Sequence, residues 1–165
     1  MTDPIEITFT VNGEPRTIRV EPRRTLADAL REECGLTGTH IGCEHGVCGA
    51  CTILIDGKPA RSCLTFAVQA AGARLRTVEG LAQNGELHPL QQAFWDNHGL
   101  QCGFCTPGFL MLAVGVLESN PEIGEAELRE ALSSNLCRCT GYQNIVKSVL
   151  AAAATARTWA KSGAR

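Results

Sequence analysis

The chain has 165 residues, enough for one ordinary domain or two small ones, and 44% of them are apolar, which argues against global disorder. With 15 basic and 17 acidic residues, it lacks the positive charge that nucleic acid or an anionic membrane would attract. The start, MTDPIEITFT, has no secretory-signal pattern, and the apolar run at 109–117 is too short to span a bilayer. We therefore expect a cytoplasmic protein with no membrane span and no nucleic-acid partner.

The first half of the chain reads as strands around one short helix. Alternating apolar residues on both sides of Asn12-Gly13 predict a β-hairpin, and Asp56-Gly57 predicts a second one. Between them an amphipathic helix is expected to start at Thr25. The expected strands lie at 6–11, 16–20, 52–56 and 74–79, and the helix at 25–34. Two hairpins and a helix predict a small α+β domain over residues 1–79.

The second half reads as helices only. GLAQNGEL at 80–87 is expected to be a linker, and residues 88–165 are expected to form an all-α bundle. Its expected helices lie at 88–97, 107–119, 124–134 and 141–156. The most apolar of them, 107–119, is expected to be the buried core helix.

Nine cysteines in a chain without an export signal favour metal binding over disulfides. The first four, Cys43, Cys48, Cys51 and Cys63, have the spacing C-x4-C-x2-C-x11-C. Three ligands in one loop and a fourth from a separate segment is the plant-type ferredoxin spacing of a [2Fe–2S] centre. Zinc is the alternative, but zinc sites usually combine two short Cys pairs, and only one such pair occurs here.

Glycines among these cysteines support the iron–sulfur interpretation. Gly42, Gly46 and Gly49 have no Cβ, so backbone N–H groups can approach the cluster sulfurs closely. Hydrogen bonds of this kind tune the reduction potential of a cluster.

A second group of four consists of Cys102 and Cys105, then Cys137 and Cys139, which is enough for one further cluster. After the first pair, Thr106 is expected to be an N-cap and Pro107 a first-turn residue; Thr140 is expected to cap a helix after the second pair. Two helix N-termini would then point towards one anionic cofactor, which their dipoles favour by about 0.3–1 kcal/mol.

The motifs GCEHGVCGACT, QCGFCTPG and CRCTGY together resemble the iron–sulfur subunit of the xanthine dehydrogenase, or molybdenum hydroxylase, family. The resemblance covers about residues 4–155 and is strongest to the separate small subunits of three-component enzymes of the carbon monoxide dehydrogenase type. It implies a β-grasp, ferredoxin-like [2Fe–2S] domain followed by a four-helix [2Fe–2S]-binding domain. All eight ligand positions of the two clusters match.

The resemblance also implies partners and a direction of electron flow. A large subunit would carry molybdopterin and a medium subunit FAD, and electrons would pass from molybdenum through both clusters to the flavin. The resemblance also implies that Gln101 and Cys139 face the pterin and help to bind it. The alternative function is a free-standing two-cluster ferredoxin-like carrier, and a third is a zinc-stabilised interaction module. No Gly-rich dinucleotide fingerprint follows a predicted strand, so the chain alone is not expected to bind a substrate.

Overall fold

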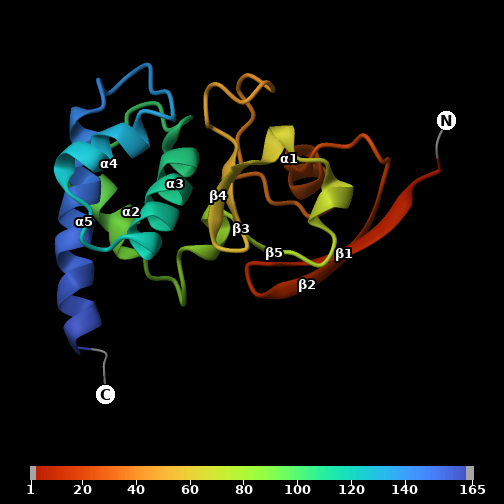
Figure 1. Cartoon of the computed structure of the whole chain (residues 1–165), viewed down its shortest axis with the longest axis horizontal. Helices are drawn as coiled ribbons and strands as arrows, with labels where there is room; N and C mark the ends of the chain where they lie inside the picture. Colours follow the sequence, from red (N-terminus) through yellow and green to blue (C-terminus); the bar gives the residue numbers. More distant parts are fainter. Residues whose placement is uncertain (1–2, 163–165) are drawn as a thin grey trace.

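The computed structural model describes residues 3–162, with side chains described up to residue 155. A five-stranded sheet and a group of four longer helices lie side by side along the long axis of the molecule (Figure 1). The strands are β1 Ile5–Val11, β2 Glu14–Val20, β3 Thr52–Ile55, β4 Lys58–Arg61 and β5 Arg74–Arg76.

The sheet has the order β2-β1-β5-β3-β4, in which β1 and β5 run parallel and the other neighbours antiparallel. Both predicted hairpins are confirmed. Asn12 and Asp56 have φ angles of 53° and 49°, each followed by a glycine with positive φ, as a tight two-residue hairpin turn requires.

One helical segment packs on this sheet, as a β-grasp fold requires. It runs through α1 Leu26–Asp28 and the π-helical turn η1 Ala29–Glu33. The Thr25 hydroxyl caps it by accepting a hydrogen bond from the Asp28 N–H at 3.1 Å. Its apolar side chains are fully buried with the inner residues of β1, β2 and β3. The predicted helix at 25–34 is therefore confirmed.

The second half contains the four predicted helices, α2 Pro89–Asp96, α3 Thr106–Ser119, α4 Glu125–Leu132 and α5 Gln143–Ser162. Every residue of α3 from Gly108 to Gly115 is buried, because this helix packs against β3 and β4 of the sheet and against helices α2 and α4. The expected core helix is thus confirmed, and it joins the two halves (Figure 1). The α+β fold class predicted from the sequence is the observed one.

Short 3-10 helices connect the main elements: η2 Ser62–Leu64 after β4, η3 Ala67–Ala70 before β5 and η4 Val78–Gly80 after it. Within the described residues, no helix combines the length and apolarity needed to cross a bilayer.

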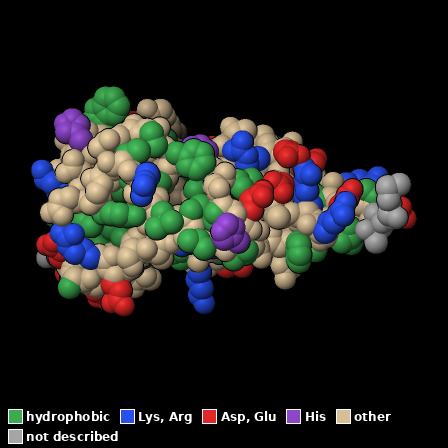
Figure 2. Space-filling model, turned by 90° about the horizontal axis from the view of Figure 1, so that it is seen from above, with side chains coloured by type: hydrophobic (Ala, Val, Ile, Leu, Met, Phe, Trp, Pro, Cys, Tyr) green, Lys and Arg blue, Asp and Glu red, His purple; other side chains and the backbone are tan. Residues whose placement is uncertain are grey.

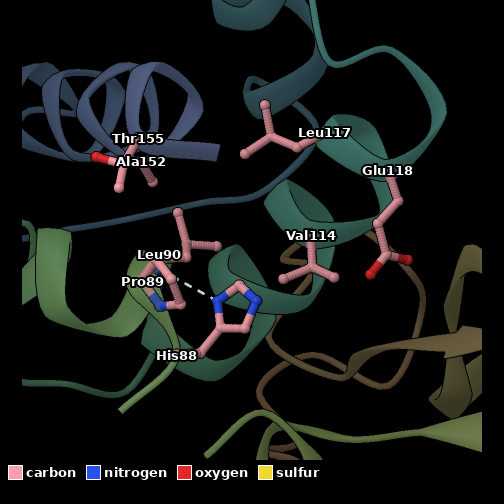
Figure 3. Close-up of a pocket in the computed structure, with 8 residues that line it drawn as sticks. All are labelled: His88, Pro89, Leu90, Val114, Leu117, Glu118, Ala152 and Thr155. Carbon is pink, nitrogen blue, oxygen red and sulfur yellow. Dashed lines mark hydrogen bonds between the residues drawn. The ribbon is translucent and has the colours of Figure 1, made fainter. Parts of the chain in front are cut away.

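A cavity of about 270 Å³ lies between α2, α3 and α5 (Figure 3). His88 is at its edge and caps α2, since its Nδ1 accepts a hydrogen bond from the Leu90 N–H at 3.2 Å. Burial lowers the pKa of His88 below its ordinary value, and nearby Arg76 lowers it further, against an opposing effect of Glu118. The lining is mainly apolar and contains no cysteine, which separates the cavity from the thiol groups.

Candidate metal centres

The first group of thiols lies where a long loop enters β3. Cys43 and Cys48 are on the loop, Cys51 directly precedes β3, and Cys63 is in η2 after β4. The β3–β4 hairpin therefore returns Cys63 to Cys51, although eleven residues separate the two in the chain. The Cys48 N–H donates to Cys43 Sγ at 3.4 Å.

The pKa values of two of these thiols are shifted in opposite directions. Backbone N–H groups of Cys48 and His45 donate to Cys43 and lower its pKa to about 6. Burial raises the pKa of Cys63 to about 12, and the adjacent Cys51 thiol adds to this effect. Cys43 is thus prepared as a thiolate ligand, whereas Cys63 needs a bound cation to ionise at neutral pH.

The glycines of this loop have different individual roles. A Cβ on Gly42 would lie 3.2 Å from Cys48 Sγ, so this position does allow the backbone to approach a sulfur. A Cβ on Gly46 would instead meet Leu64 at 2.5 Å, and one on Gly49 would meet the Asn135 Oδ1 at 2.0 Å. Gly49 is therefore required for packing against the helical half, whereas at Gly46 the exposed Leu64 side chain can move aside and the left-handed φ of +84° is the constraint.

The second group of thiols lies on two loops of the helical half. Cys102 and Cys105 precede α3, and Cys137 and Cys139 lie on the segment between α4 and α5. The hydroxyl of Thr140 lies 3.1 Å from Cys137 Sγ, and its N–H donates to the same sulfur at 3.4 Å. Burial opposes ionisation of Cys137, but these donors together lower its pKa.

The pKa values of the other three thiols of this group are shifted, in part by one another. Burial raises the pKa of Cys105 to about 12, followed by the effect of the Cys137 thiol. The Phe104 N–H lowers the pKa of exposed Cys102, whereas the Cys102 thiol raises that of exposed Cys139.

Two helix starts differ from the sequence prediction. Cys105 itself is the N-cap of α3, so Thr106 is the first helical residue and Pro107 follows it in the first turn. Helix α5 begins only at Gln143, and Thr140 is not its cap. The hydroxyl and the N–H of Thr140 instead contact Cys137 Sγ, and the hydroxyl also accepts a hydrogen bond from the Tyr142 N–H at 3.1 Å, which closes a turn before the helix.

Tyr142 shows why the α5 start is delayed. It takes a left-handed φ of 68°, and its hydroxyl accepts a hydrogen bond from the Cys137 N–H at 3.1 Å. Its ring packs edge-on against Phe109 of α3, with ring centroids 6.3 Å apart. The loop therefore folds back over the thiols before the helix can start, and only α3 places its N-terminus directly at a cysteine.

Within each group the strongest interactions between thiols lie within two pairs, and weaker electrostatic interactions join the pairs. The thiols of Cys43 and Cys48 interact, as do those of Cys51 and Cys63; in the second group, Cys102 pairs with Cys139 and Cys105 with Cys137. Among the described residues, no three or more Cys, His, Asp or Glu side chains surround a site for one metal ion. Two pairs of thiols are a ligand set that a [2Fe–2S] core, in which each iron takes two cysteines, can use.

The other candidate residues lie near these groups. Gln101 is exposed on the segment between α2 and α3, immediately before Cys102. Cys34 is half-buried at the end of η1, and burial raises its pKa, in agreement with a free thiol outside both groups. Of the two neighbouring aromatic residues of α2, Phe94 is buried, whereas Trp95 is 70% exposed.

Contacts between the two thiol loops involve residues that sequence reasoning did not select. The His40 Nδ1 lies 2.7 Å from the carbonyl oxygen of Phe104, and the two rings stack with centroids 5.0 Å apart. Arg61 and Asn135 also join the loops. These pairs are far apart in the chain, and no local pattern indicates them.

Apolar side chains are exposed around both groups, at Val47, Leu64, Phe104 and Leu136. Figure 2 shows apolar side chains spread over the helical half of one face, with acidic side chains mostly at its edge and over the sheet.

Comparison with known proteins agrees with both thiol groups. The model of the 2Fe-2S iron-sulfur cluster binding domain matches residues 9–80, and that of the [2Fe-2S] binding domain matches residues 77–150. The chain is 60% identical to the nicotine 6-hydroxylase small subunit of Paenarthrobacter nicotinovorans over 149 residues, which are 90% of either chain. The chain belongs to the iron–sulfur subunits of the molybdenum hydroxylase family.

Other members of this family have the same extent and fold. The caffeine dehydrogenase subunit gamma of Pseudomonas sp. (strain CBB1) is 59% identical over 87% of either chain. The crystal structure of quinoline 2-oxidoreductase from Pseudomonas putida 86 superimposes with a TM-score of 0.91 and 56% identity, covering 95% of this chain and 98% of that one. In the aldehyde oxidoreductase of Megalodesulfovibrio gigas, 44% identical, this chain spans only 17% of the length. The family therefore uses this two-cluster unit both as a separate subunit and as part of a longer chain.

Proposed function

We propose that this protein is the electron-transfer subunit of a molybdenum hydroxylase complex, in which its two [2Fe–2S] clusters relay electrons between partner subunits. A large subunit would hold molybdopterin and a medium subunit FAD. The observation that carries the proposal is the presence of two groups of four paired thiols, held in contact by the two halves of one chain. Close relatives of equal length are named as subunits of hydroxylases and dehydrogenases, which supports the need for partners.

The ligand assignment follows the pairing of the thiols. The first cluster would bind to Cys43, Cys48, Cys51 and Cys63 within residues 1–79, and the second to Cys102, Cys105, Cys137 and Cys139 within residues 88–165. Residues 80–87 would connect the two domains. When bound, each cluster supplies one-electron redox chemistry.

The chain's own groups stabilise the negative charge of such a site. N–H groups of Cys48 and Thr140 donate to ligand sulfurs, and the N-terminus of α3 adds the positive end of a helix dipole at Cys105. Burial of Cys51, Cys63 and Cys137 excludes water from one side of each site. Exposure of Cys102 and Cys139 leaves the second site open on the other side, where a partner can dock.

These differences in exposure support an order of electron flow. The second cluster would be the first acceptor from molybdenum, with Gln101 and Cys139 facing the pterin. The first cluster would accept next and pass electrons on to the flavin from its glycine-rich loop, which carries the exposed side chain of Val47.

Replacing Cys105 by Ser tests this order in the assembled complex. Dithionite and electron paramagnetic resonance (EPR) must first show that the first cluster still forms and is still reducible. Substrate is then expected to reduce the first cluster far more slowly than in the wild type. Reduction at the wild-type rate would show that the first cluster accepts electrons directly.

The size of the native particle separates this function from that of a free-standing carrier. Size exclusion and mass spectrometry of native extracts should find the 17.6 kDa chain in a larger complex with a molybdenum-containing and a flavin-containing chain. An iron-loaded monomer as the main species would instead support the carrier.

A further inference from the structure

Three threonines directly follow a proposed cysteine ligand, so each brings a hydroxyl group to a thiol site. They are Thr52, Thr106 and Thr140, which follow Cys51, Cys105 and Cys139. Buried hydroxyl groups in folded proteins almost always have a hydrogen-bond partner, because burial removes the water that would otherwise bind them. The three threonines differ in whether the chain itself supplies that partner.

Two of these hydroxyl groups have partners within the chain. The Thr52 hydroxyl donates to the Gly49 carbonyl oxygen at 2.6 Å. The Thr140 hydroxyl lies 3.1 Å from Cys137 Sγ and accepts a hydrogen bond from the Tyr142 N–H at 3.1 Å. Both hydroxyl groups are therefore satisfied by the protein alone.

The Thr106 hydroxyl has no such partner. Its Oγ1 is buried from solvent and forms no hydrogen bond with any of the described residues. The N–H of the same residue is in use, since it donates to the Gly103 carbonyl oxygen at 3.2 Å. The hydroxyl is thus an unused buried donor, and its burial is unfavourable unless a bound group accepts a hydrogen bond from it.

The position of Thr106 on α3 places it at the second thiol group. It is the first residue of the helix, directly after the N-cap Cys105. Phe109, three residues later and so on the same side of the helix, packs edge-on against Tyr142, whose hydroxyl accepts from the Cys137 N–H. Side chains of a helix lean towards its N-terminus, which here is the end that carries Cys105. The unused hydroxyl is therefore on the side of α3 that faces the second cysteine pair.

Hydroxyl donors are unevenly distributed over the second thiol group. Cys137 Sγ is contacted by both the hydroxyl and the N–H of Thr140. No hydroxyl bonds to Cys105 Sγ among the described residues, and burial raises the pKa of this thiol to about 12. A donor at Thr106 would supply, on the Cys105 side, the stabilisation of negative charge that Thr140 supplies on the other.

We propose that the Thr106 hydroxyl donates a hydrogen bond to a sulfur of the bound second cluster and thereby raises the reduction potential of that cluster. The proposal rests on the ligand assignment above. Reduction adds one negative charge to the cluster, so a donor stabilises the reduced state more than the oxidised state. In this step the second cluster takes up one electron from the molybdenum site, the hydroxyl keeps its proton, and no covalent bond changes.

Thr106→Val is the direct test, because valine has nearly the shape of threonine and no hydroxyl. Thr106→Ser is the matched control, since it keeps the hydroxyl and removes only the methyl group. Both are prepared in the native complex, and a redox titration followed by EPR measures the midpoint potential of each cluster. Cys105→Ser, described above, identifies the signal of the second cluster, and the first cluster serves as the internal reference.

Loss of one hydrogen bond to the cluster should shift its equilibrium towards the oxidised state about tenfold, which is about 59 mV for one electron. Thr106→Val is expected to lower the potential of the second cluster by this amount and to leave that of the first unchanged. Thr106→Ser should keep both wild-type potentials. An unchanged second potential in Thr106→Val, or an equal fall in Thr106→Ser, would overturn the proposal.

Iron and sulfide contents separate this proposal from the proposed function. Fewer than two clusters in the wild type would refute the ligand assignment itself, whereas two clusters with an unchanged potential in Thr106→Val would refute only the role of Thr106. If Thr106→Val does not keep both clusters, Thr106→Ala replaces it, because alanine removes the hydroxyl without filling its place. The same fall in the second potential is then expected, and an unchanged value would again overturn the role of Thr106.

Discussion

Replacing Gly49 by alanine is the sharpest test of the contact between the two halves. Gly49 has a φ of +71°, and an added Cβ would lie 2.0 Å from Oδ1, 2.4 Å from Cγ and 3.0 Å from Nδ2 of Asn135. Asn135 is buried, and its amide nitrogen is bonded to the Gly49 carbonyl, so the side chain cannot move aside without losing that bond.

The expected loss of stability has two separable parts. The left-handed φ alone costs an alanine roughly 1–2 kcal/mol. Displacing Asn135 adds about 1–3 kcal/mol for overpacking and about 1 kcal/mol for the lost hydrogen bond. Gly57→Ala is the matched control, because its φ is +81° and nothing lies within 4 Å of the added Cβ, so only the first part applies.

Thermal unfolding of the two iron-loaded variants at one scan rate measures the difference. In a chain of this size 1 kcal/mol corresponds to about 2–4 °C, so Gly49→Ala should melt roughly 4–16 °C below Gly57→Ala. Adding Asn135→Ala to Gly49→Ala removes all three contacted atoms and should restore part of the loss, a coupling of about 1–3 kcal/mol. Equal melting of the two glycine variants, or strict additivity with Asn135→Ala, would refute the packing argument.

Four further predictions concern the clusters and the local structure. Anaerobically purified protein should contain about four iron and four sulfide per chain with negligible zinc, and a colourless zinc protein would contradict this. Gln101→Ala should leave both cluster spectra unchanged but slow their reduction by substrate in the complex; unchanged kinetics would remove Gln101 from the pterin site. Because the pKa of His88 is lowered in the folded state, its neutral form stabilises the protein above the ordinary value of 6.5, and this contribution is lost as the pH falls. Between about pH 7.5 and 5.5, the melting temperature of the wild type should therefore fall further than that of His88→Asn, since Asn can cap α2 without titrating. An equal fall in the two proteins would contradict the assignment. Thr25→Ala should destabilise the protein by about 1 kcal/mol in denaturant unfolding through loss of the helix cap, and an unchanged midpoint would show that the cap is dispensable.

Local sequence patterns were sufficient for most of the fold. Both hairpin turns lie at Asn-Gly and Asp-Gly, where the left-handed backbone is least unfavourable, and the apolar run of 107–119 forms the buried helix. The start of α5 was mispredicted for a tertiary reason. Thr140 has the residue type of a cap, but its hydroxyl contacts the Cys137 sulfur and closes a turn with the Tyr142 N–H, and the Tyr142 hydroxyl accepts from the Cys137 N–H.

The sequence by itself determined which residues can form the two centres, because cysteine spacing decides how many thiols one loop can present. It also determined the family, through motifs that extend over nearly the whole chain. The pairing of the thiols and their uneven ionisation were decided by the tertiary structure, since burial and N–H donors act only after the hairpin and loops have brought the cysteines together.

The contact between the two centres was decided by the tertiary structure alone. Asn135 and Gly49 are 86 positions apart, and Arg61 and Ser134 are 73 apart, so no local periodicity relates them. They meet because α3 packs against β3 and β4 and places the second thiol group beside the first loop. The sequence specifies two cluster sites separately, and the packing of one buried helix against the sheet makes them neighbours.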